Sequence, residues 1–261
     1  MSINISPDGQ YYLRMAMGLA VPSPYSRRRL LPYVLGPNPL AWAMCTYTSL
    51  ALMPFAAWIY FGTMGLTASQ RIFSAALLSV LPGVWRCSVR FPVLTDAPSF
   101  ALALACAYLA RSGHVAASVV LSCVLGGMRE SGPVFAALWA WNPWPLVGLL
   151  AARWFGPTAP PDAPWLARPV HEAMKLRRAI GLDSDLYARP FGAAIVGLTA
   201  PSWQLAATVI VAHAQLMMAQ DTIRLAVWCA PVLVAAAAQA IPPAWWLLAI
   251  LWTAVQRDGR V

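Results

Sequence analysis

Charged residues are scarce in this 261-residue chain, since they make up 10% of it and only nine are acidic. Soluble globular domains carry about 25% charged residues, so the composition argues against an ordinary water-soluble domain. The five cysteines show no paired spacing, and most stand in apolar runs, so neither a disulfide framework nor a zinc site is expected. The three histidines are scattered without ligand spacing, and we expect no metal site built from protein side chains alone.

The sequence contains long apolar runs. Hydrophobic residues make up 60% of the chain, and several runs are long enough to cross about 30 Å of hydrocarbon. The runs are continuous stretches of Ala, Leu and Val, whereas membrane β-barrels alternate polar and apolar positions. The sequence therefore predicts an all-α, polytopic integral membrane protein, a helical bundle.

Apolar length and flanking charges predict about eight spans. They lie near residues 40–61, 70–85, 96–110, 114–128, 132–152, 191–218, 223–239 and 241–256. Prolines inside or at the ends of these runs predict kinked or broken helices; they are Pro54, Pro82, Pro145, Pro201 and Pro231. No internal repeat or second domain is visible, so we expect residues 1–261 to form a single membrane domain.

The N-terminal residues 1–39 are polar in comparison, and we expect a loop with a short helix on the outer face of the membrane. Residues 1–10 lack a basic start followed by an apolar core, so no cleavable signal peptide is expected. Either this short tail crosses the membrane together with the first span, or a preceding helix is missing from the chain.

The formal net charge is +9, from 18 basic and nine acidic residues. The basic residues stand in short segments between spans, which favours lipid headgroups or phosphate-bearing lipids over nucleic acid as the anionic partner. Residues 153–190 form the longest basic segment, and part of it has apolar positions at helical spacing. The positive-inside rule therefore predicts a cytoplasmic, interfacial segment at 153–190.

Alternating the predicted spans brings four dispersed acids to the outer face, and each has an arginine nearby in the sequence. These acids are Asp8, Asp96, Glu130 and Asp221. A cluster of acids and arginines suits a phosphate-bearing substrate, because arginine binds phosphate and a carboxylate accepts a hydroxyl proton. The alternative is that these acids simply lie at helix ends, where charge is less costly than at the bilayer centre.

Four stretches carry a resemblance to a known class of membrane enzymes. "SPDGQYYLRMAMGLAVPSPYSRRRLLPYVLG" at the N-terminus resembles the first outer loop of polytopic GT-C glycosyltransferases, which take a sugar from a polyprenyl-phosphate donor. "RFPVLTDAPSFALALACAYLA", "GGMRESGPVFAALWA" and "QDTIRLAVWCAPVL" resemble later acidic and basic corners of the same class. The resemblance covers most of the chain in order and spacing, although the usual first transmembrane helix is absent from it.

The resemblance implies transfer of a hexose such as mannose to an outward-facing acceptor. It makes Asp8 the general base and Asp96 a second acid that orients donor or acceptor. The residues implied in substrate or phosphate binding are Arg29, Arg129, Glu130, Asp221 and Arg224. A divalent cation, if used, would be weakly held, and a companion membrane subunit would complete the donor pocket of a shortened relative.

Each residue also has a structural interpretation. Asp8 and Asp96 suit turns or helix caps, and Arg29 suits a juxtamembrane patch on anionic lipid. Arg129 and Glu130 suit the ends of two helices, while Asp221 and Arg224 suit an ion pair on one helix face. Two other functions stay open on the same grounds: a transporter that binds a lipid headgroup, and a non-catalytic scaffold or degenerate relative.

Overall fold

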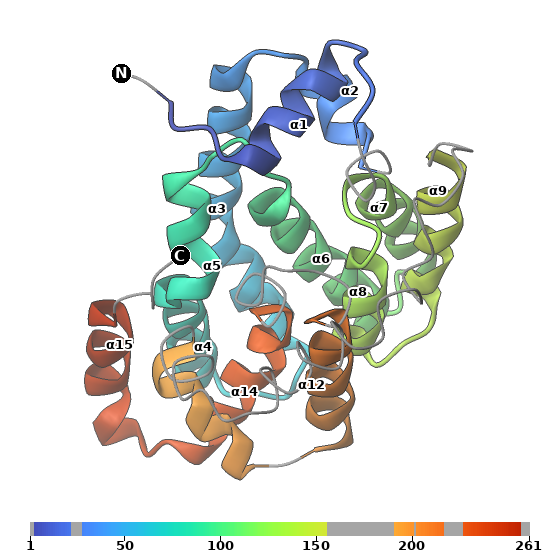
Figure 1. The fold of residues 1–261 in the computed structure, drawn as a ribbon. Helices are drawn as coiled ribbons and strands as arrows, with labels where there is room; N and C mark the ends of the chain where they lie inside the picture. Colours follow the sequence, from blue (N-terminus) through green and yellow to red (C-terminus); the bar gives the residue numbers. More distant parts are fainter. Residues whose placement is uncertain (1–2, 22–27, 156–190, 201, 217–226, 257–261) are drawn as a thin grey trace, which may run out of the picture. The chain divides into compact units, whose positions relative to one another are not determined.

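The computed structural model describes residues 3–21, 28–155, 191–200, 202–216 and 227–256. Every regular element within these ranges is a helix, and they contain no β-strand. The prediction of an all-α fold is therefore confirmed (Figure 1).

The helices of the described ranges are mostly short. In chain order the α-helices are α1 (Pro7–Ala16), α2 (Leu30–Leu35), α3 (Pro39–Gly62), α4 (Ala68–Val80), α5 (Pro82–Arg90), α6 (Asp96–Arg111), α7 (Val115–Met128), α8 (Gly132–Ala140), α9 (Gly148–Phe155), α12 (Trp203–Leu216), α14 (Ala230–Ala240) and α15 (Trp246–Val255). Four 3₁₀ helices stand between them: η2 (Trp144–Val147), η4 (Gly192–Thr199), η5 (Val227–Cys229) and η6 (Pro243–Trp245).

These helices belong to two compact units. Unit 1 comprises Met1–Ala56 and Cys87–Pro161, and unit 2 comprises Ala57–Arg86 and Asp162–Val261. The chain passes from unit 1 to unit 2 within α3 and returns within α5. The single membrane domain expected from the sequence stays a prediction.

Helix α6 lies at the centre of unit 1, where it packs against α7 and α8. Its buried face consists largely of small residues, which allow close helix approach, and Phe100 meets the ring of Trp139 from α8 at 5.2 Å between centroids. Helix α7 in turn lies alongside α9 (Figure 1). Gly126 and Gly148 meet at this contact, and a Cβ at either position would overlap a backbone carbonyl of the other helix.

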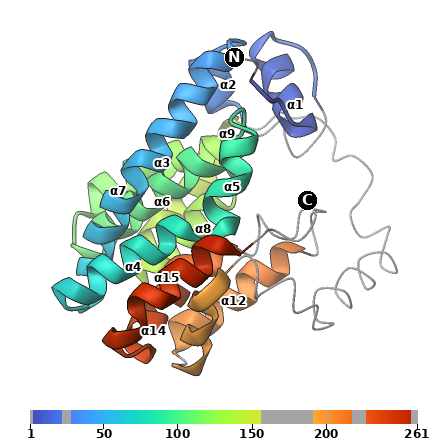
Figure 2. The ribbon, with the colours of Figure 1, turned by 90° about the vertical axis from the view of Figure 1, so that its left-hand side faces the viewer.

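Helix α14 is the buried element of unit 2. It packs against η4 and α4, and Gly197 of η4 lies so close that a Cβ would overlap the carbonyl oxygen of Leu233. Helix α4 also lies along α15 (Figure 2). At this contact Phe73 stacks on Trp246 with 4.8 Å between ring centroids. The site described below lies in unit 1.

One described helix, α3, is long and apolar enough by itself to cross a membrane. At about 1.5 Å per residue its 24 residues span about 36 Å, and only 28% of its most apolar window is buried. Large apolar side chains recur along its exposed surface: Leu40, Met44, Tyr47, Leu52, Phe55 and Trp58. This surface has the composition expected for contact with lipid.

Two bent helix pairs bring the number of membrane-capable units among the described residues to three at most. They are α4 with α5, which meet at Leu81–Pro82, and the helical stretch Val227–Ala240 with Pro243–Val255, bent by 118°. The region expected as a span at 132–152 consists of α8, η2 and α9. Broken helices are thus observed in the described chain, and the number of eight spans stays a prediction.

Replacement of Gly126 by alanine is expected to separate α7 from α9, because the new methyl group would overlap the Gly148 carbonyl oxygen. Overpacking of this kind costs about 1–3 kcal/mol, so the melting temperature in detergent micelles should fall. Val120→Ala is the matched control, because Val120 is 62% exposed on the same helix and should tolerate the change. Equal melting temperatures for the two variants would contradict the described contact.

Candidate functional site

Helix α1 begins with the residues that usually cap a helix N-terminus. Ser6 is the N-cap, and its Oγ accepts a hydrogen bond of 3.0 Å from the backbone N–H of Gly9. Pro7 follows in the first turn, where its missing N–H costs nothing, and Asp8 lies beside it, where the helix dipole favours negative charge. Ser6 is therefore the capping residue, and the Asp8 carboxylate is not needed as the cap.

Close packing at Gly9 and Tyr12 holds α1 against the rest of unit 1. A Cβ at Gly9 would lie 2.8 Å from the carbonyl oxygen of Val93, so α1 approaches the chain before α6 as closely as only glycine allows. Tyr12, which is 2% exposed, stacks on Trp42 of α3 with 5.7 Å between ring centroids. Because Asp8 precedes Tyr12 by four residues, the two side chains project from one face of α1.

The hydroxyl group of Tyr12 connects α1 to two other segments. Arg28 donates a hydrogen bond from Nη1 to this oxygen at 3.1 Å, and Oγ1 of Thr95 lies 3.3 Å from it. Since a guanidinium group only donates, the Tyr12 oxygen accepts from Arg28, and its own proton is available to Thr95. Thr95 is fully buried and directly precedes α6. Tyr12 therefore links α1 to the start of α6.

Arg28 also faces the corner between α7 and α8, where Glu130 lies. Its Nε donates to Oε2 of Glu130 at 3.0 Å, and its Nη2 donates to Oε1 at 3.3 Å. The two side chains are 16% and 30% exposed. This two-point contact, together with the bond to Tyr12, engages all three nitrogens of the guanidinium group, which a lysine cannot reproduce.

A second ion pair lies beside the first. Nη1 of Arg129, the residue directly after α7, donates to Oδ1 of Asp96, the first residue of α6. The side chain of Arg129 is 4% exposed and that of Asp96 is 18% exposed. The pair is therefore more deeply buried than that of Arg28 and Glu130, and each of its charges depends more strongly on its partner.

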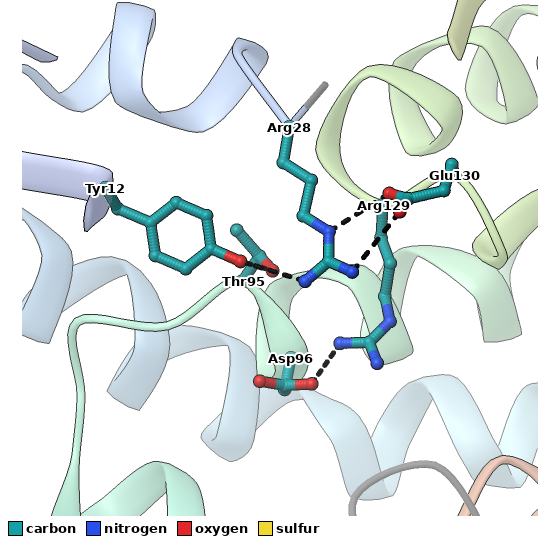
Figure 3. Close-up of polar contacts among 6 residues, drawn as sticks. All are labelled: Tyr12, Arg28, Thr95, Asp96, Arg129 and Glu130. Atoms are coloured by element: carbon teal, nitrogen blue, oxygen red, sulfur yellow. Dashed lines mark hydrogen bonds and ion pairs between the residues drawn. The ribbon is translucent and has the colours of Figure 1, made fainter. Parts of the chain in front are cut away.

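These contacts form a closed circuit, because Thr95 adjoins Asp96 in the chain and Arg129 adjoins Glu130 (Figure 3). We call it the six-residue cluster: Tyr12, Arg28, Thr95, Asp96, Arg129 and Glu130. It contains two guanidinium groups and two carboxylates, so its formal charge is zero. Four segments that are far apart in the sequence meet in it.

The charges of the cluster hold one another in the ionised state. Burial by itself lowers the pKa of Arg28, but Tyr12 and the Glu130 carboxylate outweigh burial and keep that pKa well above its usual value. Burial raises the pKa of Glu130, yet the Arg28 guanidinium, its hydrogen bonds to the carboxylate and the nearby Arg129 bring it below the usual 4.5. Glu130 is therefore a carboxylate at neutral pH and a poor proton acceptor.

Three of the predicted site residues come together in the cluster: Asp96, Arg129 and Glu130. Asp8 lies outside it, half-buried, one helical turn before Tyr12. The structure does not bring Arg29 into the cluster, since Arg29 is exposed at the start of α2 and its neighbour makes the contact.

Asp221 and Arg224 lie outside the described residues, as do residues 156–190, which are nearly all of the expected basic segment. Within the described ranges no group of three or more His, Cys, Asp or Glu residues is placed to hold a metal ion. Asp96 and Glu130 lie near each other in the described structure, and each pairs with an arginine.

Sequence reasoning missed three members of the cluster: Tyr12, Arg28 and Thr95. The four-residue spacing between Asp8 and Tyr12 was a usable signal, because it places both on one face of a helix. For Arg28 no such signal existed, since three consecutive arginines stand at 27–29 and only the fold selects the middle one.

No family model matches the chain, and no curated protein or solved structure matches it. Membership of the GT-C class therefore stays a prediction.

The stability of unit 1 is expected to fall in acid as Glu130 is protonated. The folded-state pKa of Glu130 lies below 4.5, so its carboxylate stabilises the fold above that pH and loses this effect as the pH drops through the lowered value. Thermal unfolding of wild type and Glu130→Gln should therefore differ most at neutral pH and converge at the acid end. A constant difference across the titration would contradict the described pairing.

Removal of the Asp96 carboxylate is expected to destabilise the protein strongly. Asp96→Asn leaves the buried Arg129 charge without this counter-ion, and breaking a buried pair costs about 3–5 kcal/mol. Denaturant unfolding in micelles of Asp96→Asn, Arg129→Gln and the double variant measures the coupling, and the double variant should lose less than the sum of the singles. Additive losses would show that the two side chains do not interact.

Proposed function

We propose that the chain is a polytopic membrane glycosyltransferase that moves a hexose from a polyprenyl-phosphate donor to an outward-facing acceptor. The observation that carries this proposal is the meeting of Asp96, Arg129 and Glu130 with Arg28, beside the helix that bears Asp8. These residues come from separate segments of the chain, and their arginine and carboxylate groups are the types that a phosphate-bearing substrate requires.

Asp8 is the proposed general base. In an inverting transfer, the acceptor hydroxyl oxygen bonds to the anomeric carbon while the bond from that carbon to the phosphate oxygen breaks. The phosphate leaves with the bonding electrons, and Asp8 takes the hydroxyl proton. The resemblance of the N-terminal stretch assigns this role to Asp8, which lies in the first turn of α1.

Asp96 is the proposed second acid, which orients the acceptor or donor rather than removing a proton. Arg129 and Arg29, together with Arg224, are the proposed phosphate contacts, and Glu130 and Asp221 complete the binding set. A donor phosphate that reaches Arg129 competes with Asp96 for the guanidinium group, so donor binding should loosen that ion pair. Any divalent cation belongs to the proposal as a weakly held ion.

The membrane setting is part of the same proposal. The lipid bilayer contacts α3 along its exposed apolar surface, and the eight spans, the outer-face position of the site and a companion membrane subunit are inferred from the sequence. The acids of the cluster lie at the start of α6 and after α7, at helix ends rather than helix centres. Such positions give a lipid-borne phosphate access without charge in the middle of the hydrocarbon.

One observation favours a second candidate, a non-catalytic membrane protein that acts as a scaffold or binds a lipid headgroup. The six-residue cluster is internally neutral, and its arginines already meet carboxylates, as in a structural network. A binder and an enzyme then differ in a single measurable property, which is whether sugar leaves the donor.

Asp8→Asn is the decisive variant for the enzyme, because the capping bond from Ser6 to the Gly9 backbone stays intact in it. Transfer of radiolabelled sugar from polyprenyl-phosphate donors, in membranes with matched expression, should fall at least about tenfold, equivalent to about 1.4 kcal/mol of barrier. Asp96→Asn is a poorer probe, because unfolding would also abolish transfer.

Full transfer by Asp8→Asn would remove Asp8 as the base while leaving the enzyme in place. Absence of transfer by the wild type with every donor tested, combined with saturable binding of a polyprenyl phosphate, would favour the headgroup binder.

A further inference from the structure

Arg28 joins two parts of unit 1 that the sequence separates by more than a hundred residues. Its Nη1 holds the hydroxyl of Tyr12 on α1, and its Nε and Nη2 hold the carboxylate of Glu130 at the α7–α8 corner. Figure 3 shows the guanidinium group lying between these two partners. We propose that Arg28 is a positioning residue: by joining Tyr12 to Glu130 it fixes α1, the helix that bears Asp8, against the start of α6 and the α7–α8 corner.

Apolar contacts bring α1 against the rest of unit 1. Gly9 sets the closest approach to Val93, the ring of Tyr12 stacks on Trp42, and Leu13 and Met15 pack against the same cluster. The hydrophobic effect that favours these contacts is non-directional. The Arg28 bond to the Tyr12 oxygen is directional, so it defines where the end of that ring lies.

Asp8 lies within the part of α1 that these contacts fix. It adjoins Gly9 and stands one turn before Tyr12, so a rotation or shift of α1 moves its carboxylate directly. A displacement of about 1 Å at a reacting group can lower a rate by about a hundredfold, which makes the anchoring of α1 relevant to chemistry. The catalytic part of this inference rests on the proposed function, whereas the anchoring of α1 does not.

Lysine is the informative replacement at position 28. Arg28→Lys keeps the positive charge opposite Glu130, but one ammonium group cannot form the two-point contact and also reach Tyr12 with the same geometry. Arg14→Lys is the matched control, since Arg14 is an exposed residue near the end of α1. The two variants carry the same chemical change and differ only in the contacts that they lose.

The first readout is backbone hydrogen exchange of α1 in the full-length protein in micelles, which needs no substrate. Amides of residues 11–17 are expected to exchange roughly tenfold faster in Arg28→Lys than in the wild type or Arg14→Lys, because α1 opens locally more often. Unchanged exchange in Arg28→Lys would overturn the inference, whatever its activity.

The second readout is the kinetics of sugar transfer. A positioning role predicts that kcat falls by about tenfold or more in Arg28→Lys while KM for the polyprenyl-phosphate sugar stays within about threefold. A raised KM with unchanged kcat would overturn the inference, because it would show a direct contact of Arg28 with the donor. Faster exchange of α1 in Arg28→Lys, combined with a wild type that transfers no sugar from any donor, would instead reject the proposed function and keep the anchoring.

Tyr12→Phe keeps the test decisive if Arg28→Lys fails to fold. It removes the hydroxyl that receives the Arg28 bond and retains the ring that stacks on Trp42. Exchange of α1 should rise as in Arg28→Lys, although Tyr12→Phe also removes the contact with Thr95. The double variant should exchange less than additively, because both changes break the bond between Arg28 and Tyr12. Wild-type exchange in Tyr12→Phe, or additive effects in the double variant, would reject the link through Arg28.

Discussion

Burial of two guanidinium groups is tolerated in unit 1 only because each meets a carboxylate. Arg129 is almost fully enclosed, and Arg28 is largely so, and removing such groups from water costs several kcal/mol each unless an opposite charge and hydrogen bonds compensate. This constraint decides which segments must lie together. The start of α6 has to meet the end of α7, and the chain before α2 has to meet the α7–α8 corner.

The two ion pairs depend on each other because chain neighbours belong to different pairs. Arg129 and Glu130 are adjacent but face Asp96 and Arg28, so a shift of this corner disturbs both pairs at once. Tyr12 and Thr95 extend the same dependence to α1. In the proposed enzyme, a donor phosphate that draws one arginine away from its carboxylate would therefore act on the whole cluster and on α1, the helix that bears Asp8.

The surrounding helices suit this arrangement because they are short and closely packed. Glycine and alanine at the contacts of α6, α7 and α9 allow backbones to approach, as is usual for helices that pack within membranes. Because the helices are short, unit 1 has many helix ends. In a membrane, a charged residue at a helix end costs less free energy than one at the bilayer centre. A bundle of long uninterrupted helices would offer fewer such positions for a charged site.

The sequence by itself determined the helical class, because its apolar runs are continuous and lack the alternation of polar and apolar positions that marks strands. It also located α6 and α7 to within a residue or two, since Asp96 and Arg129 bound those runs. Pro145 predicted a break within 132–152, and the chain divides there into α8, η2 and α9, but the apolar composition on both sides left the bounds of these short helices undetermined.

The tertiary structure alone decided which charges meet. Asp96, Arg129 and Glu130 could be grouped from their places at helix ends, but the choice of Arg28 over its neighbours depends on where the chain before α2 passes the α7–α8 corner. The sequence does not distinguish Tyr12 from the adjacent tyrosine. Only the fold buries Tyr12 and places its hydroxyl between an arginine and a threonine. Local sequence determines which residues can carry charge, while partner choice depends on contacts across 16 to more than 100 residues, which no local pattern encodes.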